Sequence, residues 1–395
     1  MVKRIIGIGV IYLGATIAWI ILGGTTLIRT NESEDELTLR VSDLWGEPQT
    51  QLAPQFFTQT GPAKEPEKEM HALFSSNIQT DMRLEHRRKG LLWYPTYKVT
   101  FDATYQIKNE TAKTQDFHFD YRFPSQSAIY DNFLFTVDGV KRENLSLSGG
   151  GFSEIFPLQP NEIRTIRIRY HTQGMKTWVY KLGNGVEQVR NFQLQMQTDF
   201  DQVDFPAKTV SPTQKTVQGK GWKLSWKYET LLADVSVGML FPQKLNPGPW
   251  VAKVTFFAPV SLFLFFFVLF IISVIRNVDI HPMNYFFLAA SFFSFHLLLA
   301  YLVDQISIEV ALLISSAVSV ALVISYMRLV TGIRFALMEV GITQLVYLVL
   351  FSYTFFWEAH VGLAITILSI LTLFIVMQMT GRINWNEVFQ KPKTT

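Results

Sequence analysis

Cysteine is absent from this 395-residue chain, which excludes disulfides, thiolate metal sites and a cysteine nucleophile. Charged residues are scarce, because Asp, Glu, Lys and Arg make up 17% of the chain, against about a quarter in typical soluble domains. Basic residues are not concentrated either, since residues 30–250 contain nearly equal numbers of basic and acidic side chains. A nucleic-acid partner, which requires a basic face, is therefore not expected.

Motifs of catalytic and metal chemistry are also missing. The histidines of the polar segment do not stand in a metal-ligand spacing such as HExxH; they are His71, His86, His118 and His171. The acidic residues Asp199, Asp201 and Asp204 lack the glycine and the terminal glutamate of a calcium loop. We therefore predict no catalytic, cofactor-binding or metal-binding residues, and a protein that is not an enzyme.

Long hydrophobic runs are what the chain has instead. Hydrophobic residues make up 49% of the sequence, and they concentrate in residues 5–28 and again from about 251 to 380. The first run follows a basic start and is longer than the apolar core of a cleaved signal peptide, which has about 7–15 residues. We expect an uncleaved signal-anchor helix over residues 1–29, with Gly14 and Ala18 as a small-residue packing face.

Five further runs are each long enough to cross about 30 Å of hydrocarbon. They cover residues 251–275, 282–303, 308–328, 334–356 and 360–380. Basic residues then gather on one side of the membrane: Lys3, Arg4, Arg276, Arg328, Arg334, Arg382, Lys391 and Lys393. The opposite short turns hold Asp304, Glu309 and Glu358, and the exceptions are Arg29 and Lys253. By the positive-inside rule, both termini are cytoplasmic and the large polar segment lies outside.

The polar segment reads as β-structure after an irregular approach. Residues 30–70 are acidic and then rich in Pro and Glu, which predicts a loosely structured linker. From Tyr97 to Ile107 hydrophobic and polar residues alternate. The same period of two recurs at Phe117/Phe119/Tyr121/Phe123, Ile166/Ile168/Tyr170, Phe192/Leu194/Met196 and Trp222/Leu224/Trp226. This pattern predicts antiparallel sheets packed as one large sandwich or two smaller ones.

The predicted fold class is therefore a membrane protein with a six-helix transmembrane bundle, one helix before and five after a large all-β, sandwich-like extracytoplasmic domain. The predicted parts are a signal anchor (1–29), a linker (30–70), the β domain (71–249), a five-helix bundle (250–381) and a short cytoplasmic tail (382–395).

Polar residues inside the predicted spans need a reason, because a charge at mid-helix costs about 2.5–3.5 kcal/mol on insertion scales. Glu339, Thr343 and Tyr347 form a stripe at helical spacing in the fifth span. The fourth span has its own stripe, which consists of Ser315, Ser319 and Tyr326 and is followed by Arg328. A structural ion pair between Arg328 and Glu339 is the favoured interpretation, and a proton or ion pathway through the stripes is the alternative.

His296 lies about halfway along the third span and shares a face with Ala289 and Ala300. Small residues on the same face are typical of a close helix contact. We expect a packed, hydrogen-bonded histidine, with a functional histidine as the alternative.

The segment "HPMNYFFLAASFFSFHLLLAYLVDQ" resembles the CreD family of bacterial inner-membrane proteins, in which a His-Pro-Met-x-Tyr motif opens the C-terminal helices. Here the motif is His281, Pro282, Met283 and Tyr285. "SDLWGEPQTQLAPQF" is similar to another family pattern through Trp45, Gly46, Gln51 and Pro54. A later Trp-x-His-Pro segment of the family is absent, so the chain resembles a divergent member. The resemblance implies a role in cell-envelope integrity and brings no reaction or catalytic residues with it.

The function expected from the sequence is that of a non-enzymatic protein of the bacterial inner membrane that supports the cell envelope. Its partners would be the lipid bilayer and a periplasmic protein or envelope component, bound by the β domain. The alternative is a transporter or channel that uses the polar stripes, and a membrane enzyme is a third interpretation. The oligomeric state does not follow from the sequence.

Overall fold

The computed structural model describes residues 2–60, 67–89, 92–143, 145–183, 188–232, 235–381 and 383. The chain divides into two compact units, which are called here the helical unit (Met1–Glu34 with Leu245–Thr395) and the β unit (Asp35–Lys244). Of the basic residues assigned above to the cytoplasmic side, Arg382, Lys391 and Lys393 lie outside the described residues. The predicted tail falls outside them too, apart from Ile383.

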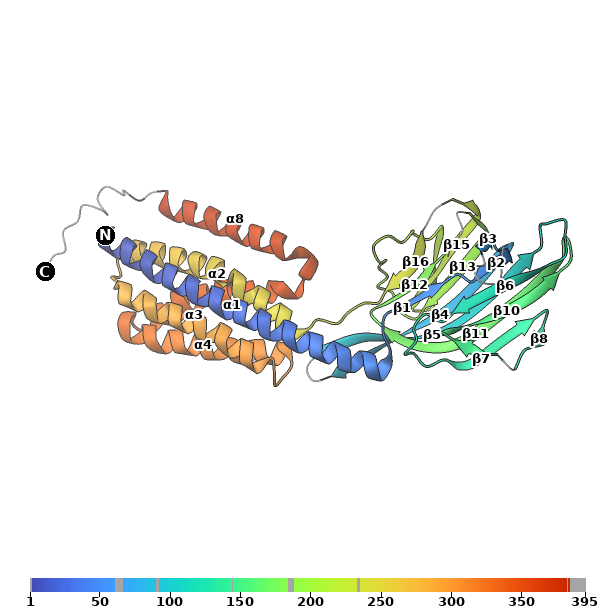
Figure 1. Cartoon of the computed structure of the whole chain (residues 1–395). Coiled ribbons are helices and arrows are strands. Elements are labelled where there is room, and N and C mark those ends of the chain that lie inside the picture. The colour runs from blue at the N-terminus through green and yellow to red at the C-terminus, as the bar shows by residue number, and fades with distance from the viewer. Residues whose placement is uncertain are drawn as a thin grey trace. The chain divides into compact units, whose positions relative to one another are not determined.

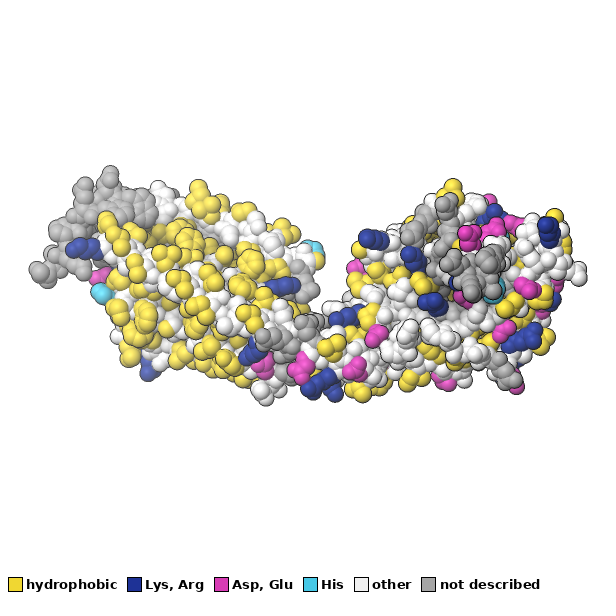
Figure 2. Space-filling model, in the orientation of Figure 1, with side chains coloured by type: hydrophobic (Ala, Val, Ile, Leu, Met, Phe, Trp, Pro, Cys, Tyr) yellow, Lys and Arg dark blue, Asp and Glu magenta, His cyan; other side chains and the backbone are white. Residues whose placement is uncertain are grey.

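Six long apolar helices confirm the predicted spans, and α1 to α4 run side by side in the helical unit (Figure 1). They are α1 (Val2–Trp45), α2 (Pro247–Ile275), α3 (Pro282–Leu302), α4 (Ile308–Thr331), a composite fifth span (Ile333–Phe356) and α8 (Val361–Thr380). Hydrophobic side chains cover most of the visible surface of this unit (Figure 2). In α8 only Thr372 and Val376 are buried, and Val361, Ile365 and Leu368 are partly buried against the helical core, so the rest of the helix surface is left for lipid.

The fifth span is not a regular α-helix. It begins with α5 (Ile333–Phe335) and then widens into a π-helical turn, η1 (Ala336–Gly341). After α6 (Ile342–Gln344) a second π-helical turn follows, η2 (Leu345–Leu350). The helix narrows through α7 (Phe351–Tyr353) to the 3₁₀ turn η3 (Thr354–Phe356), and η4 (Glu358–His360) precedes α8. The hydrophobic pattern gave no sign of this irregularity, because one extra residue per π turn leaves the span apolar.

The expectation of a loosely structured linker over residues 30–70 is wrong for most of its length. Helix α1 continues to Trp45, and the strands β1 (Gln49–Leu52), β2 (Gln55–Thr60) and β3 (Glu67–His71) follow. No Gly or Pro interrupts the chain between residues 30 and 45. Leu37, Val41 and Trp45 recur every four residues and pack in one small cluster with β-unit side chains. Gly46, at φ +100°, then ends the helix.

The β unit contains three sheets, and five of the strands form one sheet in the order β3-β2-β6-β10-β9. Its remaining members are β6 (Gln115–Arg122), β10 (Gly151–Leu158) and β9 (Leu147–Ser148). A three-stranded sheet has the order β1-β12-β16, with β12 (Thr177–Lys181) and β16 (Ser236–Leu240).

The third sheet has eight strands, in the order β14-β15-β13-β4-β5-β11-β7-β8. They are β14 (Gln214–Gln218), β15 (Gly221–Leu231), β13 (Val189–Thr198), β4 (Ser75–Lys89), β5 (Leu92–Lys108), β11 (Ile163–Met175), β7 (Asp131–Val137) and β8 (Val140–Lys141). The strands are mostly antiparallel as predicted, but β1 pairs with β12, and β13 with β4, in parallel. Both parallel pairs join strands that are far apart in sequence, where a long connection makes the parallel direction available.

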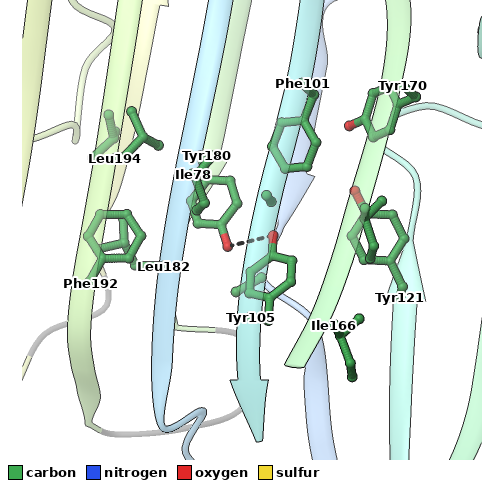
Figure 3. Packing of buried hydrophobic residues seen from close by; sticks show 14 of the residues in the cluster. Ile78, Phe101, Tyr105, Tyr121, Ile166, Tyr170, Tyr180, Leu182, Phe192 and Leu194 are labelled. Carbon is green, nitrogen blue, oxygen red and sulfur yellow. Dashed lines mark hydrogen bonds between the residues drawn. The ribbon is translucent and has the colours of Figure 1, made fainter. Parts of the chain in front are cut away.

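One hydrophobic core serves all three sheets, so the β unit is one sandwich-like body and not two. From Tyr97 to Ile107 the residues of β5 alternate between the core and the outward face. Phe101 reaches Trp178 of the three-stranded sheet, with the ring centroids 6.4 Å apart. Tyr105 reaches Phe119 of the five-stranded sheet at 6.3 Å. Figure 3 shows other members of this core, with Phe101 beside Tyr170 and the hydroxyls of Tyr105 and Tyr180 joined by a hydrogen bond.

Small residues in α1 do allow close helix contacts, but Gly14, one of the two that were predicted to do so, is not among them. A Cβ at Gly14 would meet open space, whereas one at Gly7 would lie 3.1 Å from the Pro282 ring and one at Gly23 would lie 3.1 Å from the Phe256 ring. Gly7 and Gly23 therefore allow α1 to approach α3 and α2 closely. The sequence pattern marked the small residues without indicating which side of the helix has a neighbour.

Candidate functional site

Glu339 is paired with Arg276 of α2, and the predicted pair with Arg328 is wrong. Glu339 Oε1 lies 3.3 Å from Arg276 Nη2, while the Arg328 side chain is exposed. Arg276 directly follows α2 and reaches Glu339, whereas Arg328 lies in the last turn of α4 and forms no ion pair with Glu339 in the described structure. The second carboxylate oxygen, Oε2, is buried without a hydrogen-bond partner among the described residues. The carboxylate is therefore only half satisfied.

Gln344, a residue that sequence reasoning missed, joins the fifth span to the polar stripe of α4. Its Nε2 donates to Ser319 Oγ at 3.0 Å, and Ser319 Oγ donates to the Ser291 carbonyl at 2.7 Å. This chain of hydrogen bonds links the fifth span to α4 and α3. Thr343 satisfies itself instead, because its hydroxyl donates to the Glu339 carbonyl one turn earlier. The sequence did show Gln344 as an amide inside an apolar run. It was missed because it does not lie at the four-residue spacing from Glu339 that Thr343 and Tyr347 share.

Several polar atoms near these stripes keep unused hydrogen-bonding capacity. Ser315 Oγ, Ser316 Oγ and Gln344 Oε1 are buried, and none has a partner among the residues that the structure describes. Ser315 and Gln344 are fully inaccessible to solvent. Buried polar groups in native proteins are usually satisfied. These three atoms of α4 and the fifth span are therefore available to form hydrogen bonds with a small polar species.

Tyr347 joins the fifth span to two other helices. Its hydroxyl lies 2.6 Å from Thr372 Oγ1 of α8. Its carbonyl, in the π-helical turn η2, accepts from Ser261 Oγ of α2. The otherwise lipid-exposed α8 is thus anchored through one of its two buried residues.

His296 is packed and hydrogen-bonded, as the favoured interpretation expected. The side chain is 1% exposed, and its Nδ1 lies 3.0 Å from the Phe292 carbonyl, one turn earlier in α3. The ring packs edge-on against Trp19 of α1 at a centroid distance of 5.5 Å. The face of α3 that contains His296 therefore makes its close contact with a large aromatic residue of α1.

The His-Pro-Met-x-Tyr segment starts α3 and receives α1. His281 is the N-cap and its Nδ1 accepts from the Met283 backbone N–H at 3.2 Å. Pro282 occupies the first turn, where a missing N–H costs nothing, and its ring lies against Gly7. Tyr285 is fully buried with its ring edge-on to Phe266 at 5.1 Å. His281, Pro282 and Tyr285 thus have structural roles at this helix junction, although the buried Tyr285 hydroxyl has no hydrogen-bond partner among the described residues.

Two arginines hold α1 at its two ends within the helical unit. Arg4 donates to Ser273 Oγ at 2.8 Å and lies 3.5 Å from Asp279. Arg29, an exception to the charge pattern, donates to the Ala300 carbonyl at 3.0 Å and lies 3.1 Å from Asp304. Pairing with Asp304 explains why a basic residue is tolerated at that end.

The second family-like segment, Trp45 to Pro54, forms the junction of the three sheets. Gln51 is fully buried, and its Oε1 accepts from Tyr121 at 3.0 Å and from Tyr170 at 2.7 Å. Its Nε2 donates to the carbonyls of Leu52 at 2.7 Å and Arg122 at 2.9 Å. Gln51 lies on β1, Tyr121 on β6 and Tyr170 on β11, so one amide joins three sheets. Tyr121 and Tyr170 lie side by side in Figure 3.

Burial is the largest cause of the pKa shifts of His71 and Tyr130 in the β unit. Burial lowers the pKa of His71 below its ordinary value of 6.5, and Glu69 and Glu110 oppose the shift. His71 Nε2 lies 3.0 Å from Thr58 Oγ1. Burial also raises the pKa of Tyr130 to about 12, although its hydrogen bond to the Ser125 carbonyl acts the other way. These shifts favour the neutral form of both groups at pH 7.

The outward face of the eight-stranded sheet contains a hollow of about 410 Å³, called here the sheet hollow. Five of its six strands, from β15 to β11, are adjacent in the sheet, and β14 adds the sixth. The lining residues are Gln79, Thr80, Asp81, Thr100, Asp102, Arg169, Gln195, Met196, Gln197, Gln218 and Lys223. Met196 and Thr80 are buried on the core side of their strands, and the other lining residues supply amides, a hydroxyl and charges of both signs. Figure 2 likewise shows charges of both signs scattered over the β unit.

The described residues contain no group of three or more His, Cys, Asp or Glu side chains that could hold a metal ion. In the sheet hollow, Arg167 holds Asp102 with two hydrogen bonds of 2.9 and 2.7 Å, and Arg83 lies 3.5 Å from Asp81. The arrangement can donate and accept hydrogen bonds along an elongated polar ligand.

Solved structures that this chain matches include two distant ones. A Legionella pneumophila protein described as nutrient-binding is 10% identical, with 55% of this chain and 76% of that chain covered and a TM-score of 0.33. An M1 zinc metallopeptidase from Deinococcus radiodurans is 12% identical, with 39% of each chain covered and a TM-score of 0.20. These likenesses are too low to carry an argument about fold or function. No curated protein matches the sequence.

A family model described as "Inner membrane protein CreD" matches residues 184–386, which is just over half of the chain. The match includes the end of the β unit, all five C-terminal spans and the motif at His281, Pro282, Met283 and Tyr285. The pattern around Trp45 and Gln51 lies before the matched residues. With six apolar helices and a β unit between the first and the second, the chain belongs to the CreD family of inner-membrane proteins.

Proposed function

We propose that this multi-pass inner-membrane protein supports the integrity of the bacterial cell envelope, and that its β unit binds a periplasmic protein or envelope component. The sheet hollow is the observation that carries the proposal. Outward faces of sheets are normally flat and solvated, whereas this face is hollowed across several strands and lined with polar groups. A concave surface with convergent polar groups is the usual form of a binding site.

The charges of the helical unit support cytoplasmic termini and an extracytoplasmic β unit. Arg4 and Arg276 lie at the end of the bundle that also contains Asp279 and Glu339. Arg334 follows the turn at Gly332 on the same side of the membrane in the predicted threading. At the other end Arg29 is neutralised by Asp304. Arg4 and Arg276 are paired as well, so the support comes from the larger number of basic residues at their end, to which Lys3 and Arg334 add, as the positive-inside rule requires of the cytoplasm.

A binding role fits the sheet hollow better than a reaction does. Its carboxylates are engaged by arginines, and its amides are neither nucleophiles nor bases at neutral pH. The residues that line the hollow include no histidine, serine or tyrosine.

Mass spectrometry of the full-length protein in native lipid particles, extracted without detergent, tests this proposal. We expect a protein or glycan at a fixed stoichiometry that is lost when the sheet hollow is altered by Gln195→Ala and retained in the Gln193→Ala control. Recovery of lipids alone, under conditions where the protein is folded, contradicts a binding role for the β unit. A small molecule lost on Glu339→Gln instead assigns the function to the membrane.

Transport is the second candidate, and the irregular fifth span favours it. Two π-helical turns flank Gln344, and buried polar atoms of Ser315, Ser316 and Gln344 remain unpartnered in the described structure. Such turns occur frequently at functional sites. Flux of protons or alkali cations into liposomes containing the protein, compared between wild type, Gln344→Leu and the exposed-residue control Arg328→Gln, distinguishes the two functions. Loss of a measurable flux only in Gln344→Leu supports transport, and absence of flux in the wild type argues against it.

A further inference from the structure

The sheet hollow is built as two rows of outward side chains across neighbouring strands. Strand register places Gln195 opposite Gln79, Gln79 opposite Asp102, and Asp102 opposite Arg169. The second row consists of Lys223, Gln197, Asp81 and Thr100. Strands lie about 4.8 Å apart, so the four steps from β15 to β11 span roughly 19 Å. The hollow is therefore elongated across the strands.

The charges in the hollow are not equivalent. Asp102 and Asp81 are each engaged by an arginine outside the lining, Arg167 and Arg83. Arg169 and Lys223 are exposed, and neither has an ion-pair partner among the residues that the structure describes. These two cations lie on β11 and β15, the first and last of five adjacent strands. Free positive charge is therefore available at both ends, with neutral amides and engaged carboxylates between.

This arrangement discriminates between classes of ligand. A peptide strand would pair with the edge of a sheet and would need pockets for its side chains, whereas this site is on a face and its lining side chains are polar. A nucleic acid would need many more free cations. Glutamine amides can donate to and accept from hydroxyl and acetamido groups, and carboxylates can accept from sugar hydroxyls. Carboxylate groups on the ligand would form ion pairs with Arg169 and Lys223 at the two ends of the hollow.

We propose that the sheet hollow binds an acidic glycan, a chain of several sugars with hydroxyl and acetamido groups whose carboxylates contact Arg169 and Lys223 at the ends of the hollow. This inference rests on the proposed role of the β unit in binding an envelope component and specifies the chemical class of that component. Since the hollow has no aromatic platform in its lining, affinity depends on hydrogen bonds and charge.

The test uses the full-length protein in lipid nanodiscs and two soluble probes. One is a tetrasaccharide of alternating N-acetylglucosamine and N-acetylmuramic acid, which has carboxylates, and the other is the neutral tetramer of N-acetylglucosamine. Binding is measured by saturation-transfer NMR titration at low and high salt. Gln195→Ala is matched by Gln193→Ala, the next outward residue of the same strand. The double variant Arg169→Ala/Lys223→Ala is matched by Lys227→Ala, on the same face of β15. Thermal unfolding checks that each variant is folded.

We expect the carboxylated probe to bind more tightly than the neutral one, and more weakly as salt rises. Gln195→Ala is expected to weaken both probes by roughly 3- to 10-fold, the range for one or two lost hydrogen bonds. The double variant is expected to weaken only the carboxylated probe and to remove its salt dependence, while Gln193→Ala and Lys227→Ala bind like wild type.

Equal binding of the two probes, or binding that the hollow variants do not change, overturns the inference. If neither probe binds although native lipid particles retain another component on the β unit, the glycan inference fails and the proposed function stands. If neither probe binds and no component is retained, both fail.

Discussion

Arg276 and Glu339 form an ion pair of 3.3 Å between the end of α2 and the first π-helical turn of the fifth span. The pair connects the first and the fourth of the five C-terminal spans, which are not neighbours along the chain. Glu339 is mostly buried and Arg276 is largely exposed. The carboxylate therefore depends on a partner that solvent reaches.

Replacing Arg276 should destabilise the helical unit modestly. In Arg276→Gln the carboxylate loses its partner, but because the arginine is exposed we expect a loss of no more than about 1 kcal/mol. Thermal unfolding in a mild detergent measures the effect. Arg328→Gln is the matched control and should unfold like wild type. Equal destabilisation by the two substitutions would favour the pair between Arg328 and Glu339 that the sequence suggested.

Gln51→Ala should destabilise the β unit strongly. The substitution leaves two tyrosine hydroxyls and two backbone carbonyls without this partner, and each buried group left unsatisfied costs about 1–3 kcal/mol. Urea unfolding of the full chain, followed by tryptophan fluorescence, should show a lower midpoint for the β unit. Gln59→Ala, at an exposed position on β2, should have no comparable effect. A midpoint unchanged in Gln51→Ala would contradict the junction role.

Gly7→Leu should loosen the attachment of α1 to the other helices. A Cβ at Gly7 would already lie 3.1 Å from Pro282, whereas Gly14 has open space around it. Overpacking costs typically about 1–3 kcal/mol, so we expect a lower unfolding temperature for Gly7→Leu and an unchanged one for Gly14→Leu. Sensitivity at Gly14 and tolerance at Gly7 would mean that α1 packs through its other face.

Stability of the β unit should depend on pH through His71. Burial lowers the pKa of the folded imidazole, so the unfolded chain binds a proton at a higher pH than the folded protein does. The contribution of neutral His71 is therefore fully present above the unfolded pKa near 6.5 and is lost as pH falls through it towards the folded pKa. Urea midpoints of wild type and His71→Asn between pH 7.5 and 5 measure this. The wild type should lose more stability over that interval, and parallel curves would show that His71 does not contribute.

Local sequence patterns predicted the helices and strands well where buried residues recur at a fixed spacing along the chain. The spans were found because crossing hydrocarbon requires about 20 apolar residues in a row. The strands of β5 and β11 were found because alternate residues face one core. The extension of α1 to Trp45 was missed because acidic residues suggested a linker, although the apolar repeat at Leu37, Val41 and Trp45 was present. The π-helical turns could not be predicted from an apolar repeat, since they alter the backbone geometry and not the amino-acid composition.

The candidate sites depended on contacts that cross the sequence. Glu339 and His296 were identifiable as polar residues in apolar runs, but their neighbours Arg276 and Trp19 come from other helices. Gln51 was visible only as part of a family-like pattern, and its role required three sheets to meet at one amide.

By itself, the sequence determined the six spans, the β unit between the first two and the absence of cysteine chemistry, because each depends on composition or on a short repeat. Only the tertiary structure decided which charges pair, which small residues of α1 face a neighbour, and where the sheet hollow lies. The hollow joins side chains from residue 79 to residue 223. Its position follows from strand order and register, which depend on the simultaneous packing of segments that are distant along the chain.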